Sequence, residues 1–456
     1  MITIQSDSRK IKPGDTFIAL RGISSDGHSY IEKAIQNGAT KIIAEEGSYS
    51  VLTEIVSDTR FYLNTYLKEH YDPYLKKMRL IGVTGTNGKT TTAWFLHSLL
   101  HHLGESSAYI GTIGFYIDEQ KEADLPNTTV DLCDMYDLLL QAYDRKCQTV
   151  ILEVSSHALA MGRIKTLAFD GAIFTNLTQD HLDYHKTMEN YALAKQLLFR
   201  QVKEQGIAFV NADDPYKKYF FLEHLQTQTY GFSSSDYQVT SYQTYLHKTT
   251  FTYRWEGSEY VVQSKLIGRY NVYNTLGAIA FLHAFGYPLD RLNALAATLN
   301  PPVGRLETIH FKSNTIVIDY AHTPDAIEKI ILTMKEVTKG HMYVVFGCTG
   351  DRDRSKRPMM AELVAKLTDY FIITNDDPHF EDPNQIVGDM LKGATFKNYE
   401  VCLDRGAAIR KGMALLKKED TLLILGKGHE EVMIIGNDHV PFNDKKEVLK
   451  NLEESN

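Results

Sequence analysis

The sequence has 456 residues, with 49 Lys and Arg residues against 57 Asp and Glu residues, and a formal net charge of −8. This length predicts about three domains and excludes a small module that needs disulfides to fold. The acidic balance argues against nucleic acid as the main partner, because proteins that bind the phosphate backbone carry a basic excess. The apolar fraction of 43% and charged fraction of 23% are typical of soluble globular proteins.

The sequence predicts a cytoplasmic protein without a membrane segment. No stretch approaches the roughly 20 consecutive apolar residues that span a bilayer. The N-terminal segment lacks the basic start, apolar core and small-residue cleavage site of a secretory signal. The cysteines, Cys133, Cys147, Cys348 and Cys402, are too widely spaced for a C-x-x-C motif, so we expect buried thiols without metal or redox chemistry.

The first part of the chain is predicted to form a small domain that ends in a linker. Short apolar runs at residues 16–20 and 41–45 are separated by turns that contain Gly and Ser. The polar, proline-containing residues 69–77 are expected to be the linker.

From Arg79 onward, the pattern predicts a parallel β-sheet with helices on both faces. Continuous apolar runs, such as residues 149–154 and 171–174, alternate with helix-length amphipathic segments. Residues 236–266 instead alternate strictly and are rich in Thr, Tyr and Val, which predicts an antiparallel appendage. Helices are expected over residues 271–299.

A second alternation of strands and helices begins after Pro301 and Pro302 and predicts a Rossmann-like domain. A helix is expected to open at Pro324, a favoured first helical position for proline. We therefore expect an α/β fold of three domains, at residues 1–78, 79–300 and 301–456. The central one is predicted to hold a P-loop-type parallel sheet with the antiparallel appendage.

Residues 79–100, RLIGVTGTNGKTTTAWFLHSLL, predict a strand, a glycine loop and a helix. Glycines let the backbone wrap around an anion, which the loop N–H groups and the helix dipole attract. Lys89 adds a full charge, and Thr90 offers a hydroxyl to magnesium. The strict Walker pattern is not met, because its first glycine is displaced from Val83 to Gly85. We predict ATP or another nucleoside triphosphate here, bound by Gly85, Thr86, Asn87, Gly88, Lys89, Thr90 and Thr91.

Eight further motifs follow this loop: EVSSHAL at residues 153–159, TNLTQDHLDYH at 175–185, YALAKQLLF at 191–199, GRYNVYN at 268–274, VGRLE at 303–307, IDYAHTPDA at 318–326, GDRDRSKRP at 350–358 and LGKGHE at 425–430. Together with TGTNGKTTT, they resemble the Mur ligases, the ATP-dependent amide ligases of peptidoglycan precursor synthesis. DSR at 7–9, GDTFIALRG at 14–22 and DGHSYI at 26–31 resemble the branch that adds the third residue of the stem peptide. The resemblance implies a first domain that binds a UDP-linked substrate, a central domain that binds ATP and a third that binds an amino acid.

Glu153, His181 and Lys195 are the candidate residues around the phosphates, together with Lys89. A carboxylate at the end of a parallel strand, as expected for Glu153, can hold magnesium. Lys195 falls inside the apolar stripe of its predicted helix, where desolvation favours a neutral amine that can take up carbon dioxide. The resemblance implies that Glu153 and His181 bind metal and that Lys195, as a carbamate, supports a second magnesium ion. The alternatives are an exposed Glu153, a structural His181, and a Lys195 that reaches solvent from the stripe edge.

The resemblance assigns further positions to three ligands. It implies ATP contacts for Asn271, Asn274, Arg305 and Asp319, although Asn271 could be a plain N-cap and Asp319 could end a turn. It implies acceptor contacts for Ser8, Asn127, Thr128, Thr129, Ser155 and Arg163. It implies amino-acid contacts for Arg357, Asp377, His379, Gly426 and Glu430.

Two segments depart from the family pattern. Enzymes of this branch that add diaminopimelate carry Asp-Asn-Pro-Arg, whereas this sequence has Asp377 for the asparagine and His379 for the arginine. A lost guanidinium and a gained carboxylate favour a substrate with a distal cation, so lysine or another diamino acid such as ornithine is expected. Near the uridine end, Ile23, Ser24 and Ser25 replace the usual His-Gln-Ala.

These features predict a monomeric ligase that acts on UDP-N-acetylmuramoyl-L-alanyl-D-glutamate. A carboxylate of the acceptor attacks the γ-phosphate of ATP, and the amine of an amino acid then attacks the resulting acyl phosphate. One alternative is a related ligase for another carboxylate acceptor in a specialised peptide pathway. Another is a catalytically inactive nucleotide-binding regulator, which the intact set of Lys89, Glu153, His181 and Lys195 argues against. A relative of folylpolyglutamate synthase is disfavoured by the N-terminal motifs.

Overall fold

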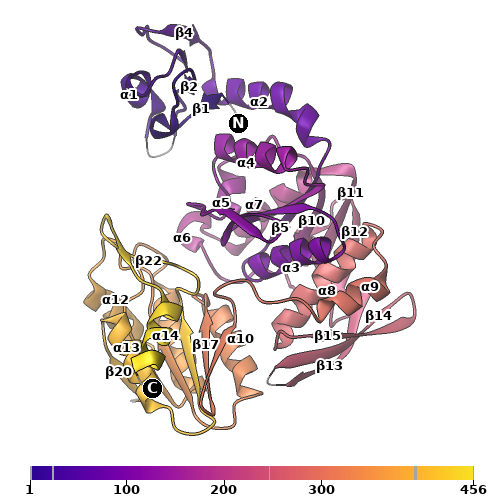
Figure 1. Cartoon of the computed structure of the whole chain (residues 1–456), viewed down its shortest axis with the longest axis vertical. Coiled ribbons are helices and arrows are strands. Elements are labelled where there is room, and N and C mark those ends of the chain that lie inside the picture. Colours follow the sequence, from indigo (N-terminus) through magenta and orange to yellow (C-terminus); the bar gives the residue numbers. More distant parts are fainter. Residues whose placement is uncertain (1–2, 23–24, 246, 395–397, 455–456) are drawn as a thin grey trace.

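The computed structural model describes residues 3–22, 25–245, 247–394 and 398–454, so Ile23 and Ser24 lie outside the described residues. The described part has the predicted α/β fold, with one main β-sheet in each of three successive regions (Figure 1). No helix among these residues is long and apolar enough to cross a membrane.

The first region is a parallel sheet of four strands in sequence order. Its elements are β1(Ile4–Gln5), β2(Thr16–Ile18), α1(Ile31–Gln36), β3(Lys41–Ala44), β4(Leu52–Ile55) and α2(Thr59–Leu75). The linker expected at residues 69–77 is mostly helical, because α2 continues through Pro73 to Leu75. The helix persists because its aromatic side chains pack on the next domain, with ring centroids of Tyr71 and Tyr136 6.2 Å apart. The linker prediction was therefore wrong.

The central region is built on an eleven-stranded sheet with the order β15-β14-β13-β12-β11-β10-β5-β9-β6-β7-β8. Its strands are β5(Arg79–Thr84), β6(Ser107–Gly111), β7(Gly114–Ile117), β8(Gln120–Ala123), β9(Thr149–Glu153), β10(Phe169–Phe174), β11(Val202–Asn211), β12(Gln226–Gly231), β13(Tyr237–Tyr245), β14(Lys248–Trp255) and β15(Ser258–Ser264). Strands β13 to β6 of this order pair in parallel. Antiparallel pairs extend both edges, with β14 and β15 beyond β13 and with β7 and β8 beyond β6. The predicted antiparallel appendage thus continues the same sheet.

Helices cover this sheet and bring the sequence motifs to one edge. They are α3(Lys89–His102), α4(Leu132–Asp144), α5(Ser156–Ala160), α6(Leu182–His185), α7(Met188–Arg200), α8(Arg269–Ala284) and α9(Leu289–Ala296). Strands β10, β5 and β9 are neighbours, so their carboxyl ends lie side by side. Ligands bind at this edge in open parallel α/β sheets.

The third region is a six-stranded sheet with the order β16-β17-β21-β18-β19-β20, parallel except for β16. Its elements are β16(Glu307–Phe311), β17(Asn314–Asp319), α10(Pro324–Lys335), β18(Met342–Phe346), α11(Lys356–Leu367), β19(Tyr370–Ile373), α12(Pro383–Leu391), β20(Tyr399–Val401), α13(Arg405–Leu415), β21(Thr421–Leu425), a hairpin of β22(Val432–Ile435) and β23(Asp438–Pro441), and α14(Asp444–Glu454). The start of α8 packs on this region, since Ile267 shares a buried cluster with Ile327 and Ile331 of α10.

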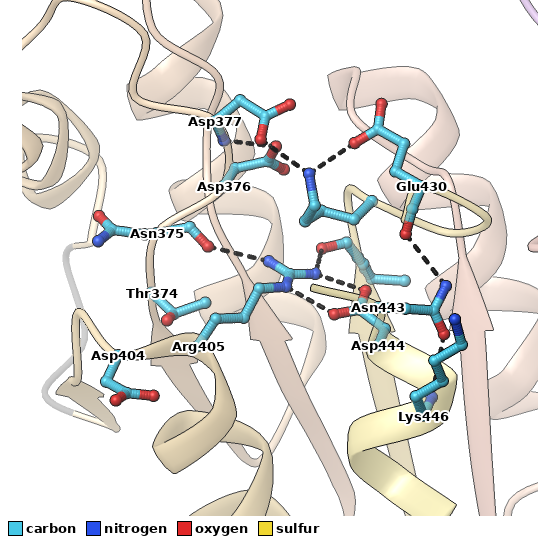
Figure 2. A network of polar contacts seen from close by, with 12 residues as sticks. Thr374, Asn375, Asp376, Asp377, Asp404, Arg405, Glu430, Asn443, Asp444 and Lys446 are labelled. Atoms are coloured by element: carbon cyan, nitrogen blue, oxygen red, sulfur yellow. Dashed lines mark hydrogen bonds and ion pairs between the residues drawn. The ribbon is translucent and has the colours of Figure 1, made fainter. Parts of the chain in front are cut away.

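A fully buried ion pair ties the last helix to the third sheet. The Arg405 guanidinium donates to both oxygens of Asp444, over 2.7 and 2.8 Å, and also to the carbonyls of Asn375 and Leu425. Figure 2 shows Arg405 between Asn375 and Asp444. The pair therefore joins α13, the start of α14 and the ends of two strands.

We expect Asp444→Asn to lower the free energy of unfolding by about 3 to 5 kcal/mol, because a buried guanidinium loses its counter-charge. Urea unfolding followed by circular dichroism measures the change. Lys366→Ala is the control, since Lys366 and Glu362 form an exposed pair worth about 0.5 kcal/mol or less. Similar losses in the two variants would contradict a stabilising role of the buried pair.

Candidate active site

The glycine loop lies between β5 and α3, where Gly88 forms the N-cap of α3 with a positive φ of 84°. A Cβ atom on Gly88 would lie 2.6 Å from Asn274 Oδ1, so the neighbouring α8 also requires glycine there. Lys89 Nζ donates to the carbonyls of Gly85 and Thr86 over 3.0 and 2.9 Å. Burial lowers the pKa of Lys89, while the negative charge of Glu153 opposes this shift.

Glu153 ends β9 beside this loop and is fully buried, at 0% exposure. Its carboxylate accepts hydrogen bonds from Thr90 Oγ1 at 2.8 Å, from the Thr112 N–H at 3.0 Å, and from the Tyr109 hydroxyl. The alternative of an exposed strand-end carboxylate is wrong. Thr90 and Glu153 together present hard oxygen atoms beside the phosphate loop.

Lys195 projects from α7 to the same loop and is 1% exposed, so it does not reach solvent. Its Nζ donates to the Gly85 carbonyl at 2.8 Å and lies 4.5 Å from the centre of the Tyr191 ring. Burial, and then the positive charge of Lys89, hold the pKa of Lys195 well below its usual value. The environment therefore favours a neutral, nucleophilic amine.

His181 is the N-cap of α6 and has a positive φ of 54°. Its Nε2 lies 3.3 Å from Asp180 Oδ2, and its ring centre lies 4.7 Å from that of His157. Burial lowers the pKa of His181, although the negative charge of Asp180 opposes the shift. The lowered pKa favours the neutral ring, the form that can bind a metal.

The predicted acceptor residues of the central domain surround the end of β9. Thr129 Oγ1 donates to the Glu153 carbonyl at 2.9 Å and accepts from the Ser155 N–H at 3.0 Å. Arg163 donates to the Thr129 carbonyl over 3.2 Å. Thr128 Oγ1 lies 3.1 Å from Thr112 Oγ1, and Asn127 is exposed.

Ser8 belongs to the first domain and is not part of this group of contacts in the described structure. It is buried, and its carbonyl accepts a hydrogen bond from Asn37 Nδ2. Its neighbour Lys10 forms an ion pair with Asp134 of α4 over 2.6 Å, which links the first domain to the central one.

A cavity of about 520 Å³ lies between the central and third domains. Its lining includes the predicted residues Asn87, Gly88, Thr91, Asn271, Asn274, Arg305 and Asp319. Arg305 donates to Thr90 Oγ1 over 3.3 Å and lies over the Tyr320 ring at 4.5 Å. The cavity is large enough for a nucleotide and opens onto the phosphate loop.

Two of these lining residues have local roles that the sequence left open. Asn271 is not the N-cap of α8, because the helix starts at Arg269 after Gly268. Its side chain instead donates to the Ile267 carbonyl and accepts from Asn274. Asp319 accepts from the N–H groups of Leu306 and Ala321, so it orders the chain beside Arg305.

In the third domain, Asp377, Gly426 and Glu430 come together around a lysine. Lys427 Nζ donates to Asp377 Oδ1 at 2.8 Å and to Glu430 Oε2 at 2.6 Å. A Cβ atom on Gly426 would lie 2.3 Å from Asp376 Oδ2. Burial raises the pKa of Glu430 to about 7, although Lys427 lowers it in part. Figure 2 shows Asp376, Asp377 and Glu430 on adjoining loops.

The structure gives the Arg357 side chain partners of its own, whereas the amino-acid contact of His379 stays a prediction. Arg357 is 0% exposed, and its guanidinium donates to Glu381 and Asp389 over 2.9 to 3.2 Å. Arg357 thus joins α11 to α12 and to the segment before it, and its charge is already paired. His379 lies next to the hairpin, where its backbone bonds to Ile434 and Gly436.

The sequence analysis did not identify some of the residues at the site. Asp180 and Lys427 lie inside quoted motifs and could have been found as charged neighbours of His181 and Glu430. Burial is the main cause that lowers the pKa of His157. The positive charge of Arg352, an exposed arginine of the GDRDRSKRP motif, also lowers it. Thr112 carries no comparable signal, because only the pairing of β6 with β9 brings it to Glu153.

Three family models match nearly the whole chain. They are the Mur ligase family catalytic domain at residues 2–80, the Mur ligase middle domain at 83–282 and the Mur ligase glutamate ligase domain at 304–428. A UDP-N-acetylmuramoyl-L-alanyl-D-glutamate–2,6-diaminopimelate ligase of Geobacillus kaustophilus is 38% identical, over 98% of this chain and 93% of that protein. The chain belongs to the Mur ligase family. The Mur ligase of the same description from Bacillus cereus is also 38% identical, over 97% and 92% of the two chains.

Solved Mur ligase structures share the fold. One, described as a UDP-N-acetylmuramoyl-L-alanyl-D-glutamate–2,6-diaminopimelate ligase, is 31% identical, with a TM-score of 0.68 over 99% of this chain and 94% of that one. The MurF ligase from Thermotoga maritima, solved in complex with ADP, has a TM-score of 0.73 over 99% and 98% of the chains at 21% identity. The order of the three domains is therefore that of the Mur ligases.

We expect Gly88→Ala to destabilise the protein more than Gly104→Ala. Both glycines have a φ of 84°, so both variants incur left-handed strain of about 1 to 2 kcal/mol. The Gly88 variant adds overpacking against Asn274 of about 1 to 3 kcal/mol, whereas a Cβ at Gly104 meets no described atom within 4 Å. Urea unfolding compares the two. Equal losses would show that the loop does not require glycine for its contact with α8.

Proposed function

We propose that this Mur ligase joins an amino acid to a carboxylate of UDP-N-acetylmuramoyl-L-alanyl-D-glutamate, with cleavage of ATP to ADP and phosphate. The observation that carries the proposal is the convergence of Lys89, Glu153, His181 and Lys195 on the phosphate loop. The 38% identity to ligases named for this acceptor supports the substrate. Addition of the third peptide residue in peptidoglycan precursor synthesis is the resulting role.

The donor set at the loop fits magnesium. The Thr90 hydroxyl and the Glu153 carboxylate lie 2.8 Å apart and offer the oxygen ligands that this ion prefers. His181 and a carbamylated Lys195 would hold a second ion, and the low pKa of Lys195 supports carbamate formation. Bound magnesium would neutralise charge on the transferring phosphoryl group.

The residues of this chain account for the remaining requirements of the reaction. The loop N–H groups and Lys89 bind the phosphates, while Arg305 brings a second cation from the third domain to Thr90. Thr129, Ser155 and Arg163 contact one another and the end of β9 beside Glu153, which supports their proposed role in binding the acceptor. The third domain covers the cavity and so shields the acyl phosphate from water.

The carboxylates of the third domain support a diamino acid as the nucleophile. Asp376, Asp377 and Glu430 carry more negative charge than Lys427 balances, so a second ammonium fits among them. With a pKa near 7, Glu430 can also take a proton from the incoming amine. We infer that a simple distal ammonium, as in lysine or ornithine, is preferred to the distal amino-carboxylate of diaminopimelate.

We also infer the setting in which the protein works. Domain boundaries at 78/79 and 300/301 are supported by the gaps between the family matches, which end at 80 and 282 and resume at 83 and 304. We infer a monomer, because the central and third domains of a single chain together line the cavity. Use of ATP supports a cytoplasmic location.

The decisive measurement is phosphate release from ATP with UDP-N-acetylmuramoyl-L-alanyl-D-glutamate and a panel of lysine, ornithine, diaminopimelate and neutral amino acids. We expect release that requires both the acceptor and one diamino acid, with lysine or ornithine favoured. Selection of diaminopimelate would overturn the inference from Asp377 and His379 but keep the ligase. No release with any amino acid, from protein that binds ATP, would favour a different acceptor.

We expect Lys195→Ala to lower turnover by about 100-fold or more, because removal of a preorganised charge in a phosphoryl-transfer site costs that much. Depletion of carbon dioxide and bicarbonate should lower the activity of the unmodified protein and leave that of the variant unchanged. Lys203→Ala is the control, since Lys203 pairs with Asp170 at the surface. Unchanged turnover of Lys195→Ala would refute the proposed carbamate.

A further inference from the structure

A hydrogen bond links the phosphate loop directly to the third domain. Asn87 Nδ2 donates to Asp325 Oδ2 over 2.7 Å, between residues 238 positions apart in the sequence. Asp325 lies in the first turn of α10, where the helix dipole favours a carboxylate. Lys329, one turn later, donates to the same oxygen over 2.8 Å. The carboxylate is thus held in place from its own helix.

The remaining contacts of Asn87 all come from the central domain. Its N–H donates to Asn176 Oδ1 at 3.0 Å, and its carbonyl accepts from Thr175 Oγ1 at 2.6 Å and from Asn176 Nδ2 at 2.9 Å. The side-chain amide also donates to Thr178 Oγ1 of the central domain, over 3.4 Å, which is longer than its 2.7 Å bond to Asp325. The central domain therefore holds the backbone of Asn87, and the shorter of its two side-chain hydrogen bonds is made to the third domain. Because Gly88 follows at once, the position of Asn87 bears on the phosphate-binding end of α3.

The contact also lies at the wall of the interdomain cavity. Asn87 lines that cavity together with Ala326 and Lys329 of α10. The same helix packs on the start of α8, where a Cβ atom on Gly268 would lie 2.4 Å from Thr333 Cγ2. An opening that moves α10 away from the glycine loop would separate Asp325 from Asn87.

We propose that Asp325 is a positioning residue that couples closure of the third domain to the geometry of the phosphate loop. It acts through Asn87 and does not touch the reacting atoms. The loop reaches its reactive arrangement only when the third domain is closed and the acyl phosphate is shielded. This inference rests on the proposed function, because it assigns Asp325 a part in that same reaction.

A charge-swap series tests the contact. N87D places two carboxylates face to face and should lower kcat/KM for ATP by about 100-fold, the effect of a 1 Å misplacement in a reaction site. D325N keeps an acceptor for Asn87, so kcat/KM for ATP should fall by about fivefold or less. This is the change expected when a charged hydrogen bond becomes a neutral one. In the double variant N87D/D325N, the amide at position 325 can donate to the carboxylate at position 87, so the hydrogen bond forms in the opposite direction. Its kcat/KM for ATP should be about tenfold higher than that of N87D alone.

Domain closure is measured in parallel by small-angle X-ray scattering with and without magnesium ATP, which does not depend on ligation. We expect ATP to contract the unmodified protein and the double variant, and to contract N87D less. K339A is the control, because Lys339 pairs with Glu419 on the exposed surface of the third domain. Urea unfolding of each variant shows whether a loss of activity reflects a loss of fold.

The outcomes separate this inference from the proposed function. A double variant no better than N87D, or an N87D that closes and turns over as the unmodified protein does, overturns the role of Asp325. Absence of ligation by the unmodified protein, with closure that still follows the charge-swap series, overturns the proposed reaction and keeps the coupling. Recovery of both activity and closure in the double variant supports the coupling.

Discussion

The carbonyl of Gly85 accepts hydrogen bonds from two lysines, the half-buried Lys89 and the buried Lys195, and the rest of the site is arranged around that concentration of positive charge. Two ammonium groups at one carbonyl repel each other in a region with little water, so either one loses its proton or an anion must join them. A triphosphate supplies such an anion, and a carbamate on Lys195 would supply another. The same requirement explains why Glu153 and Asp180 are buried beside the loop.

The order of the strands determines which side chains can meet these charges. Because β5 lies between β9 and β10, the loop after β5 is flanked by Glu153 on one side and by the segment leading to His181 on the other. Helix α7, which carries Lys195, follows in the same crossover and covers the sheet next to β5. The site is therefore a consequence of parallel pairing rather than of proximity in the sequence.

Much of this arrangement could be predicted from local patterns. Apolar runs located β9, β17 and β21, and the apolar stripe of α7 predicted the burial of Lys195. Local patterns failed where distant partners decide the outcome. Arg357 has the residue type and motif of a carboxylate ligand, but its charge is taken up by Glu381 and Asp389, 24 and 32 residues later. No spacing rule anticipates such a pairing, and the same holds for the helical continuation of α2.

The third domain illustrates the limit most clearly, because its contribution to the phosphate site consists of contacts across the interface. Arg305 reaches Thr90, Asp325 reaches Asn87, and Lys356 lies 3.7 Å from Asp180. Each contact joins a charged group of the third domain to a polar or charged residue at the carboxyl edge of the central sheet. Polar pairs of this kind separate at lower cost than apolar contacts, since water can replace each partner. A ligase that must admit three substrates and then exclude water needs both properties, tight geometry when closed and a modest cost of opening.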